Sequence, residues 1–428
     1  MGRRRRGVSL GTVIMLLLTV AVVAGCCVFL AFIGGEDAYE RTSSLLEQLA
    51  QREAAAADST LAPSAREAAP ATAAPVAQTP VPTAAPSPVP EASTFTLAAA
   101  GTVYAPKAVR QCAQESGDHY DFTQMFAGLG DALSRADLTV MTLETTTAGQ
   151  EKGYGNYNTP PQILDALRDS GVDLVALATE RALDKGYEGL EITLSELTTR
   201  GMASTGVSLQ GGNSGTVMNI GGVQVALLAY TYGLSDEGKE KSQADERGAV
   251  AMIDTEAMVE DIVSARVNGA DVVVVLPHWG TKNKQETPDN VRALARTLAE
   301  AGADVILGTH PNVVQGTERL SVTRSDGLTY ESIVCYSLGS MLTDARTPEN
   351  TAGMIAQLEI TYDPVTRRTS LGELQITPVY IARQREDNQN VYRVVDAGNA
   401  QAVSALSPQE QAAAQEAAQF VSKMTGQQ

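Results

Sequence analysis

Short apolar runs alternate with helical patterns along the middle of the chain, and residues 271–314 show this most clearly. Residues 271–276 form a β-branched apolar run that ends at Pro277, which is typical of a strand buried on both faces. Residues 287–302 carry apolar side chains on one helical face, begin with a capping threonine and a proline, and stop at a glycine. Residues 303–307 form a second apolar run. The pattern predicts a β-α-β unit whose two strands are parallel.

The same alternation continues on both sides of this unit. Strands are expected at residues 95–101, 138–143, 172–178, 217–220, 223–230, 332–337 and 356–362, with further strand signal at 375–381. Helices are expected at residues 122–135, 161–170, 187–200 and 255–268. Alternating strands and helices followed by a strand-rich end predict an α/β fold built as a layered sandwich.

Two of the three histidines directly follow the buried strands of the β-α-β unit. His278 lies in Pro-His-Trp-Gly, and His310 lies in Gly-Thr-His-Pro-Asn-Val. Open α/β sheets bind ligands outside the carboxyl ends of parallel strands, so both imidazoles are expected at one crevice. Without further context, hydrogen bonds to the loop backbone explain each histidine better than a ligand role does. The third, His119, lies in a polar stretch and is expected on a surface loop.

Five segments of the chain, in order, resemble motifs of the CapA family, the bacterial poly-γ-glutamate capsule-synthesis proteins. The segments are Leu143-Glu144 and residues 178–186, 278–280, 308–315 and 336–339. They are similar, in that order, to the end of the family's NLE motif, to its ANNHxxDxG, HWG and GxHPHVxQ motifs, and to the start of its YSLGN motif. The resemblance implies an α/β/β/α sandwich of the metallophosphoesterase type over residues 95–386.

The resemblance also implies a metal site. Glu144, His278 and His310 match metal-ligand positions of the family, and three protein ligands are enough for one open site. The implied cofactor is a single divalent ion, Mn, Zn or Fe, with His278 and His310 as the catalytic groups. The alternative is a chain that binds no metal, because other ligand positions of the family are changed.

Those changes argue against a complete two-metal centre. The family has aspartate at the position of Thr102, asparagine and histidine at Glu180 and Arg181, and histidine at Asn312. Two-metal phosphoester hydrolysis needs a bridging carboxylate and several neutral imidazoles, whereas Arg181 brings a permanent cation to a ligand position. We therefore expect Arg181, Glu180 and Asn312 to bind substrate, or Arg181 to pair with Glu144 or Glu180 inside the cavity.

The charge distribution limits the range of partners. The 428 residues carry a formal net charge of −18, and the basic cluster that stands out in the sequence is Arg3–Arg6 at its amino end. A surface that binds nucleic acid needs a basic patch on the folded domain. We therefore expect no nucleic-acid partner, and the resemblance points instead to an anionic envelope polymer such as poly-γ-glutamate.

The first 35 residues have the pattern of a membrane anchor. Residues 11–33 are uncharged and almost wholly apolar, which satisfies the roughly 20 residues needed to cross a bilayer. Arg3–Arg6 precede this run, so the amino end is expected in the cytoplasm and the rest of this single-pass protein outside the cell membrane. A cleavable signal peptide is one alternative, although its apolar region usually has about 7–15 residues. Lipoprotein processing at Cys26 is the other.

The remaining chain divides into three parts. Residues 36–94 are expected to form a stalk and an Ala/Pro-rich spacer, because this composition cannot bury a core. Residues 95–386 form the expected folded domain, and residues 387–428 form a tail with a peripheral helix. Ser407–Glu410 has the pattern of a capping box, and Gly426 is expected to end the helix.

The four cysteines show no spacing typical of a zinc site. Cys112 and Cys335 both fall in the expected folded domain. A disulfide between them is one possibility outside the cell, and a buried free thiol at Cys335 is favoured by its apolar surroundings.

Two functions fit these observations. The first is a membrane-anchored extracellular protein that binds or guides a capsule or envelope polymer with little or no turnover, together with other capsule-synthesis proteins. The second is a metal-dependent hydrolase that acts on a phosphoester or amide bond of the cell envelope. The changed ligand positions favour the first function, and the content of bound metal distinguishes the two.

Overall fold

The computed structural model describes residues 91–426 apart from residues 156, 213–214, 244–246 and 387–388. The expected anchor and most of the expected stalk and spacer, residues 1–90, lie outside the described part. None of the helices within that part is long and apolar enough to cross a membrane.

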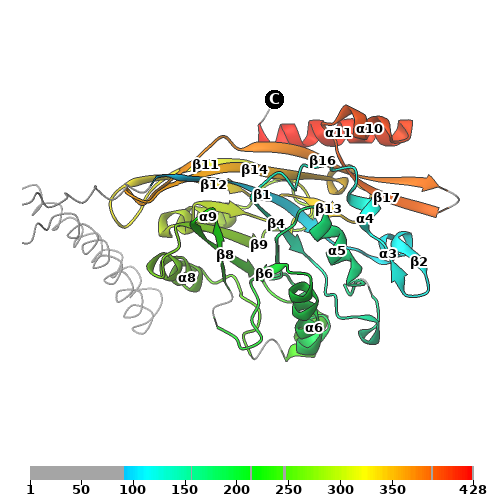
Figure 1. The fold of residues 1–428 in the computed structure, drawn as a ribbon, viewed down its shortest axis with the longest axis horizontal. Coiled ribbons are helices and arrows are strands. Elements are labelled where there is room, and N and C mark those ends of the chain that lie inside the picture. The colour runs from blue at the N-terminus through cyan, green and yellow to red at the C-terminus, as the bar shows by residue number, and fades with distance from the viewer. Residues whose placement is uncertain (1–90, 156, 213–214, 244–246, 387–388, 427–428) are drawn as a thin grey trace, which may run out of the picture.

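Two stacked β-sheets form the centre of the domain (Figure 1). The larger sheet contains β1 (Ser93–Val103), β4 (Leu138–Leu143), β5 (Leu174–Ala176), β6 (Ala203–Thr205), β13 (Ser340–Leu342), β14 (Ala352–Asp363), β15 (Arg368–Leu371), β16 (Gln375–Glu386) and β17 (Gln389–Asp396). The smaller sheet contains β7 (Thr216–Ile220), β8 (Val223–Thr231), β9 (Val272–His278), β10 (Val305–Leu307), β11 (Thr317–Thr323) and β12 (Thr329–Cys335). A separate hairpin is made by β2 (Gln114–Ser116) and β3 (His119–Tyr120).

Strand direction places the carboxyl ends of the central strands together. In the larger sheet, β1, β4, β5 and β6 run parallel, and β14, β16 and β17 add antiparallel strands beside β1. In the smaller sheet, β8, β9, β10 and β12 run parallel, with β7 and β11 antiparallel at the two edges. The expected β-α-β unit is therefore confirmed as β9, a helix and β10.

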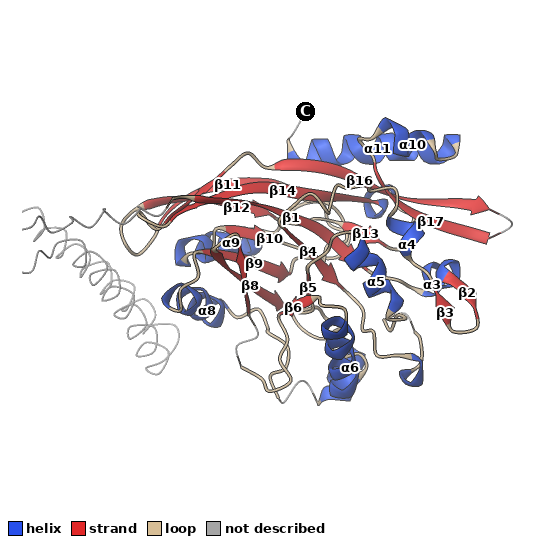
Figure 2. Ribbon diagram, viewed as in Figure 1, coloured by secondary structure: helices blue, strands red, loops and turns tan. Residues whose placement is uncertain are grey.

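Helices cover the outer sides of the two sheets (Figure 2). The helices are α3 (Lys107–Ala113), α4 (Thr123–Phe126), α5 (Gln162–Asp169), α6 (Gly186–Thr199), α7 (Asp236–Ser242), α8 (Thr255–Val267), α9 (Asp289–Ala301), α10 (Ala400–Ser404) and α11 (Pro408–Thr425). The described residues also form two short 3-10 helices, η1 (Gln150–Lys152) and η2 (Pro348–Thr351). α8 and α9 lie on the smaller sheet and α10 and α11 on the opposite side, on the larger sheet, which is the layered arrangement that the sequence predicted.

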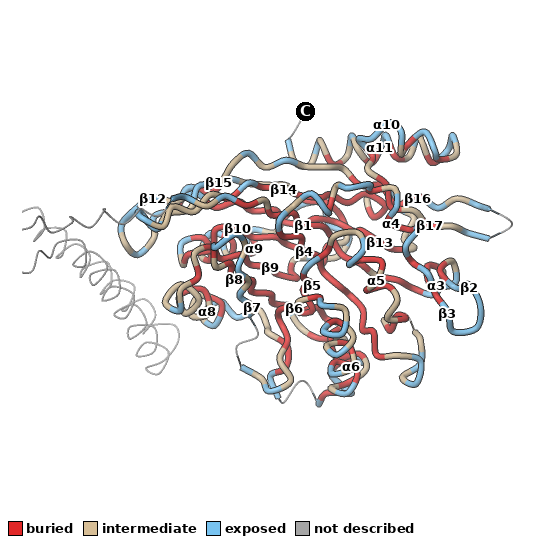
Figure 3. Tube along the Cα trace, viewed as in Figure 1, coloured by how far each residue is buried: buried red, intermediate tan, exposed pale blue. Residues whose placement is uncertain are grey.

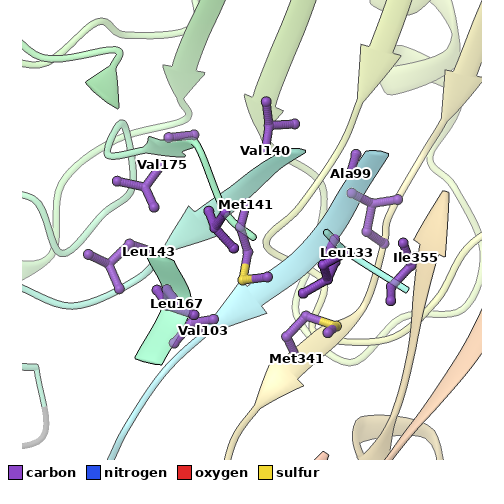
Figure 4. Close-up of a cluster of buried hydrophobic side chains, with 14 of the residues drawn as sticks. Ala99, Val103, Leu133, Val140, Met141, Leu143, Leu167, Val175, Met341 and Ile355 are labelled. Carbon is purple, nitrogen blue, oxygen red and sulfur yellow. The ribbon is translucent and has the colours of Figure 1, made fainter. Parts of the chain in front are cut away.

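The alternation of side chains along β9 divides the protein interior into two cores. Val272 and Val274 point between the sheets, whereas Val273 and Val275 pack against α8 and α9. A strand that is buried on both faces in this way has a continuous apolar sequence. Buried chain runs through both sheets (Figure 3), and Figure 4 shows side chains of β1, β4 and their neighbours packed in the larger core.

Two local expectations for helices are wrong. Only Thr123–Phe126 of residues 122–135 is helical, because Gly128 forms a bridge with Val395 of β17 and a Cβ there would lie 2.6 Å from the Val395 side chain. Thr287 does not cap α9, whose first turn is preceded by Pro288 without a side-chain cap. The Thr287 hydroxyl instead donates to Oε1 of Gln315 at 3.2 Å.

The C-terminal segment packs more closely on the domain than the peripheral tail that the sequence predicted. The β16–β17 hairpin crosses the expected boundary at residue 386, so β17 belongs to the larger sheet. Ser407 caps α11 and Gly426 ends it in a left-handed conformation, as the sequence predicted. Glu410, however, turns into the sheet, where its Oε2 accepts from the Tyr380 hydroxyl at 2.6 Å and from the Arg383 backbone at 2.9 Å.

Both cysteines of the described domain are free thiols. Cys335 is buried in β12, as expected, and this burial raises the pKa of its thiol to about 12. The sulfur of Cys112 accepts a hydrogen bond from the Tyr392 backbone at 3.5 Å.

Replacing Glu410 with alanine is expected to lower the free energy of unfolding by about 1–3 kcal/mol, because the Tyr380 hydroxyl and the Arg383 amide lose their acceptor. Thermal unfolding measured by circular dichroism tests this, with Glu416→Ala on the exposed side of α11 as the matched control. Equal melting temperatures for the two variants would show that Glu410 does not hold α11 on the sheet.

Candidate functional site

The site lies where parallel strands of the two sheets end beside each other. β9 ends at His278, and the loop after β10 brings Thr309 alongside it in a parallel bridge. The Thr309 hydroxyl lies 3.4 Å from the hydroxyl of Thr142 in β4, which belongs to the larger sheet. Loops that follow β4 and β5 therefore meet loops that follow β9 and β10, as the strand-end rule predicts.

Glu180 and the two histidines form the centre of the site. His278 Nε2 lies 2.6 Å from Glu180 Oε2, and His310 Nδ1 lies 3.2 Å from His278 Nε2 and 3.5 Å from Glu180 Oε2. All three side chains are buried, with at most 5% of each exposed. Side chains that are 98 and 32 residues apart in the chain thus converge on one point.

This donor set fits one divalent ion. Among the described residues, Glu180, His278 and His310 place one ligand atom each within 4.8 Å of one another. Two histidines and a glutamate match a common catalytic zinc set, in which bonds of about 2.0–2.2 Å separate neighbouring ligand atoms by roughly 3.4 Å. The other ring nitrogen of His278, Nδ1, lies 3.0 Å from the Thr309 hydroxyl, a contact of the kind that orients metal-binding imidazoles.

Lys282 is a residue of the candidate site that the sequence analysis did not single out. Its ammonium lies 2.7 Å from Glu180 Oε1 and 3.7 Å from Glu144 Oε1. Burial alone would lower the pKa of Lys282, but the charges of Glu144 and Glu180 outweigh it and raise the pKa above its usual value. The sequence offered one signal, since Lys282 follows the strand-end His278 by four positions and so belongs to a loop at the crevice.

Burial and neighbouring charges set the protonation states. Burial would raise the pKa of Glu180, but hydrogen bonds from His278 and His310 and the charge of Lys282 hold it well below its usual value. Burial lowers the pKa of His278, against the opposing effect of Glu180. Burial and the charge of Glu180 raise the pKa of Glu144 to about 8. At neutral pH the site therefore contains a carboxylate at Glu180, a neutral imidazole at His278 and a mostly protonated Glu144.

Arg181 points to the rim of the site and not to its centre. Its guanidinium stacks on the Tyr157 ring at 3.6 Å from the centroid. It pairs with the buried Asp184 at 3.4 Å and approaches Glu180 Oε1 at 3.9 Å. The expected pairing of Arg181 with Glu180 is present at this longer distance, and its closer ion pair is with Asp184.

Two other positions from the sequence analysis lie beside the centre without joining its hydrogen bonds. The Thr102 hydroxyl is buried and has no hydrogen-bond partner among the described residues. Asn312 contributes its backbone carbonyl, which accepts from Asn350 Nδ2 at 2.9 Å and from the Ser340 hydroxyl at 3.4 Å.

Strained loop residues are held in place by two polar side chains. His310 and Asn312 have φ angles of 96° and 58°, in a region that non-glycine residues rarely occupy. Asn350 Nδ2 bonds both Asn283 Oδ1 at 2.8 Å and the Asn312 carbonyl at 2.9 Å, which ties the two site loops together. Gln315 Nε2 donates to the carbonyl of Lys284 at 2.8 Å and so fixes the loop that carries Lys282.

An open cleft of about 580 Å³ lies in front of the buried centre. Its lining includes the cations Arg181, Lys239 and Lys282, the carboxylates of Asp236 and Glu237, and the side chain of Tyr232. Tyr232 is 52% exposed and its ring lies 4.4 Å from that of His310, centroid to centroid. A polar ligand in this cleft would contact an aromatic ring and several ammonium or guanidinium groups.

The raised pKa of Glu144 predicts a pH effect on stability. Between the ordinary pKa of 4.5 and about 8, the folded state holds a proton that the unfolded state releases, so stability falls as pH rises through this window. His278, whose ordinary pKa of 6.5 is lowered, acts in the opposite direction only below 6.5. From pH 6.5 to 8 the protein is thus expected to lose up to about 2 kcal/mol, and Glu144→Gln to lose much less. Denaturant unfolding at both pH values tests this, and parallel losses in the two proteins would contradict it.

Comparison with known proteins identifies the family. The family model described as bacterial capsule synthesis protein PGA_cap matches residues 96–345. The PGA biosynthesis protein CapA of Bacillus subtilis is 26% identical over 229 residues, which cover 53% of this chain and 55% of that protein. The capsule biosynthesis protein CapA of Bacillus anthracis is 25% identical over 188 residues, which cover 43% of each. The chain thus spans about half the length of these curated relatives.

Among solved structures, the calcineurin-like phosphoesterase YfkN of Bacillus subtilis is similar at 12% identity with a TM-score of 0.41, over 78% of this chain and 99% of that one. A phosphatase from Mycoplasma pneumoniae is similar at 12% identity with a TM-score of 0.39, over 67% and 94%. The family model covers more than half of the 428 residues and includes all five motif segments. The protein therefore belongs to the bacterial capsule synthesis protein PGA_cap family.

Proposed function

We propose that this protein takes part in the synthesis or handling of an anionic envelope polymer of the poly-γ-glutamate type, which it binds or guides with little or no hydrolysis. Membership of the capsule-synthesis family supports the polymer class. The apolar run at residues 11–33 supports a membrane anchor with the domain outside the cell, and other capsule-synthesis proteins are the partners that fit this role.

The position of Lys282 is the observation that carries this proposal. Its ammonium compensates the Glu180 carboxylate, beside Glu144, at the place where a metal-dependent hydrolase would hold its positively charged ion. An internal cation neutralises the buried Glu180 carboxylate without supplying a metal-bound water. Hydrolysis at neutral pH depends on such a water, whose pKa a bound metal lowers toward about 7.

The cleft in front of the site suits a polymer that carries carboxylates. Lys239 is 55% exposed at its side chain, and Lys282 is 37% exposed. Both offer ammonium donors to an extended acidic chain, and Arg181 adds a guanidinium at the rim. A protein with a net charge of −18 needs such local cations to bind a polyanion.

A metal-dependent hydrolase of envelope phosphoester or amide bonds is the second candidate, favoured by the convergence of Glu180, His278 and His310. These three residues would hold one divalent ion, which when bound supplies a Lewis acid. Thr309 would keep the His278 ring in its orientation through Nδ1, and Tyr232 would shield the His310 side of the ion from solvent.

Charge removal from the cleft tests the polymer-binding role. Lys239→Ala is expected to weaken binding of poly-γ-glutamate several-fold at low salt and to leave the melting temperature unchanged, because its ion pair within the described residues is with the exposed Asp236. Arg181→Ala is expected to weaken binding and also to lower the melting temperature, since the buried Asp184 loses its cation. Calorimetric titration at two salt concentrations measures both effects.

Arg168→Ala is the control for these variants, because Arg168 is a similarly exposed cation on α5 that does not line the cleft. Equal affinity in all four proteins would contradict polymer binding in the cleft. Metal-dependent phosphodiester or amide hydrolysis that is lost in His278→Ala and His310→Ala would establish the hydrolase instead.

A further inference from the structure

The two oxygens of the Glu180 carboxylate contact different groups, the two histidines and a lysine. Oε2 faces the histidines, at 2.6 Å from His278 Nε2 and 3.5 Å from His310 Nδ1. Oε1 faces the ammonium of Lys282 at 2.7 Å. A divalent ion held by the donor set would therefore share its one anionic ligand with a lysine that is already bound to it.

The two cations cannot be held equally well at the same time. Unit charges 4 Å apart interact by about 4 kcal/mol at an effective dielectric constant of 20, and a divalent ion doubles this repulsion. Glu144 Oε1 lies 3.7 Å from the Lys282 ammonium, whereas Glu180 Oε1 lies 2.7 Å from it, so Glu180 is the main acceptor for both cations. Arg181, 3.9 Å from Glu180 Oε1, adds more positive charge on the same side.

The side chain of Lys282 is exposed enough for its ammonium to move away from Glu180. Its side chain is 37% exposed, in contrast to the 2% of Glu180, and it lines the open cleft. Its backbone belongs to the loop that Gln315 and Asn350 hold through Lys284 and Asn283, so the ammonium can move into the cleft while the loop stays in place. The histidines have no such exit because both are buried in the strand-end loops.

We infer that Lys282 is a built-in competitor for the divalent ion: its ammonium occupies Glu180 when the ion is absent and must be displaced into the cleft when the ion binds. This inference rests on the proposed single-ion site at Glu180, His278 and His310. The measured affinity for the ion then reflects the difference between the binding free energies of the ion and of the Lys282 ammonium at Glu180. Occupancy of the site then follows the ambient concentration of the ion, and a tightly bound metal is not part of the resting protein.

The test compares Mn²⁺ binding to the full-length protein and two lysine variants, measured by the loss of the free-ion electron paramagnetic resonance signal. Lys282→Met is expected to bind Mn²⁺ at least on the order of tenfold more tightly than the wild type, because the variant lacks both the competing ammonium and its repulsion of the ion. Lys284→Met, an exposed lysine two residues further along the same loop, is expected to stay within about twofold of the wild type. Lys282→Arg, which keeps the charge, is expected to stay as weak as the wild type.

The possible failures are distinguishable. Equal Mn²⁺ affinity in wild type and Lys282→Met, or tight binding by Lys282→Arg, would overturn the competition and leave the single-ion site standing. No Mn²⁺ binding by any of the proteins would overturn the single-ion site and the inference with it. Binding by Lys282→Met that survives the added change His278→Ala would place the ion elsewhere and likewise overturn the inference.

Folding of the variant supplies a second readout. Lys282→Met leaves the buried Glu180 carboxylate without its ammonium, so the variant is expected to melt at a lower temperature than the wild type. Mn²⁺ is then expected to raise the melting temperature of Lys282→Met more than that of the wild type, because the ion binds only the folded state. If Lys282→Met does not fold alone, Mn²⁺ is expected to restore its near-ultraviolet circular dichroism, and failure to do so would overturn the inference.

Discussion

Glu180 is 2% exposed at the junction of two β-sheets, and a carboxylate taken out of water in this way is costly unless donors or cations surround it. The side chains around it fulfil that requirement from two neighbouring strand ends: His278 and His310 through one oxygen and Lys282 through the other. His278 and Lys282 come from the end of β9 and its loop, and His310 from the loop after β10. The site is therefore a compensated buried charge whose compensation can be supplied in more than one way.

The fold provides the rigidity that this arrangement needs. Parallel strands from both sheets end at the same level, and the Thr142–Thr309 contact joins the two sheets directly below His278. Asn350 links the loops that carry Asn283 and Asn312, and it belongs to η2, which lies against α11. The C-terminal helix thus supports the sheet that carries one half of the site, although it lies on the opposite side of that sheet (Figure 1).

Patterns that depend on local physics were predictable from the sequence. The continuous apolar runs of β9 and β10 and their strand-end histidines follow from burial on both faces and from the parallel β-α-β connection. The early end of the helix expected at residues 122–135 was not predictable, because it depends on the bridge between Gly128 and Val395, which is distant in the chain. The pairing of Glu180 with His278 spans 98 residues, and no spacing rule specifies it. Lys282 was missed because a lysine in a polar loop is usually solvated, and only the buried carboxylates distinguish this one.

We have inferred that one buried carboxylate, Glu180, is shared by a resident lysine and a divalent ion. Crystals of the protein grown without metal and soaked with Mn²⁺, with anomalous scattering collected from each, test it most directly. An anomalous peak is expected between Glu180, His278 and His310 in the soaked crystals, with the Lys282 ammonium moved from Glu180 into the cleft. A Mn²⁺ peak at the three ligands with Lys282 still bonded to Glu180 would contradict it.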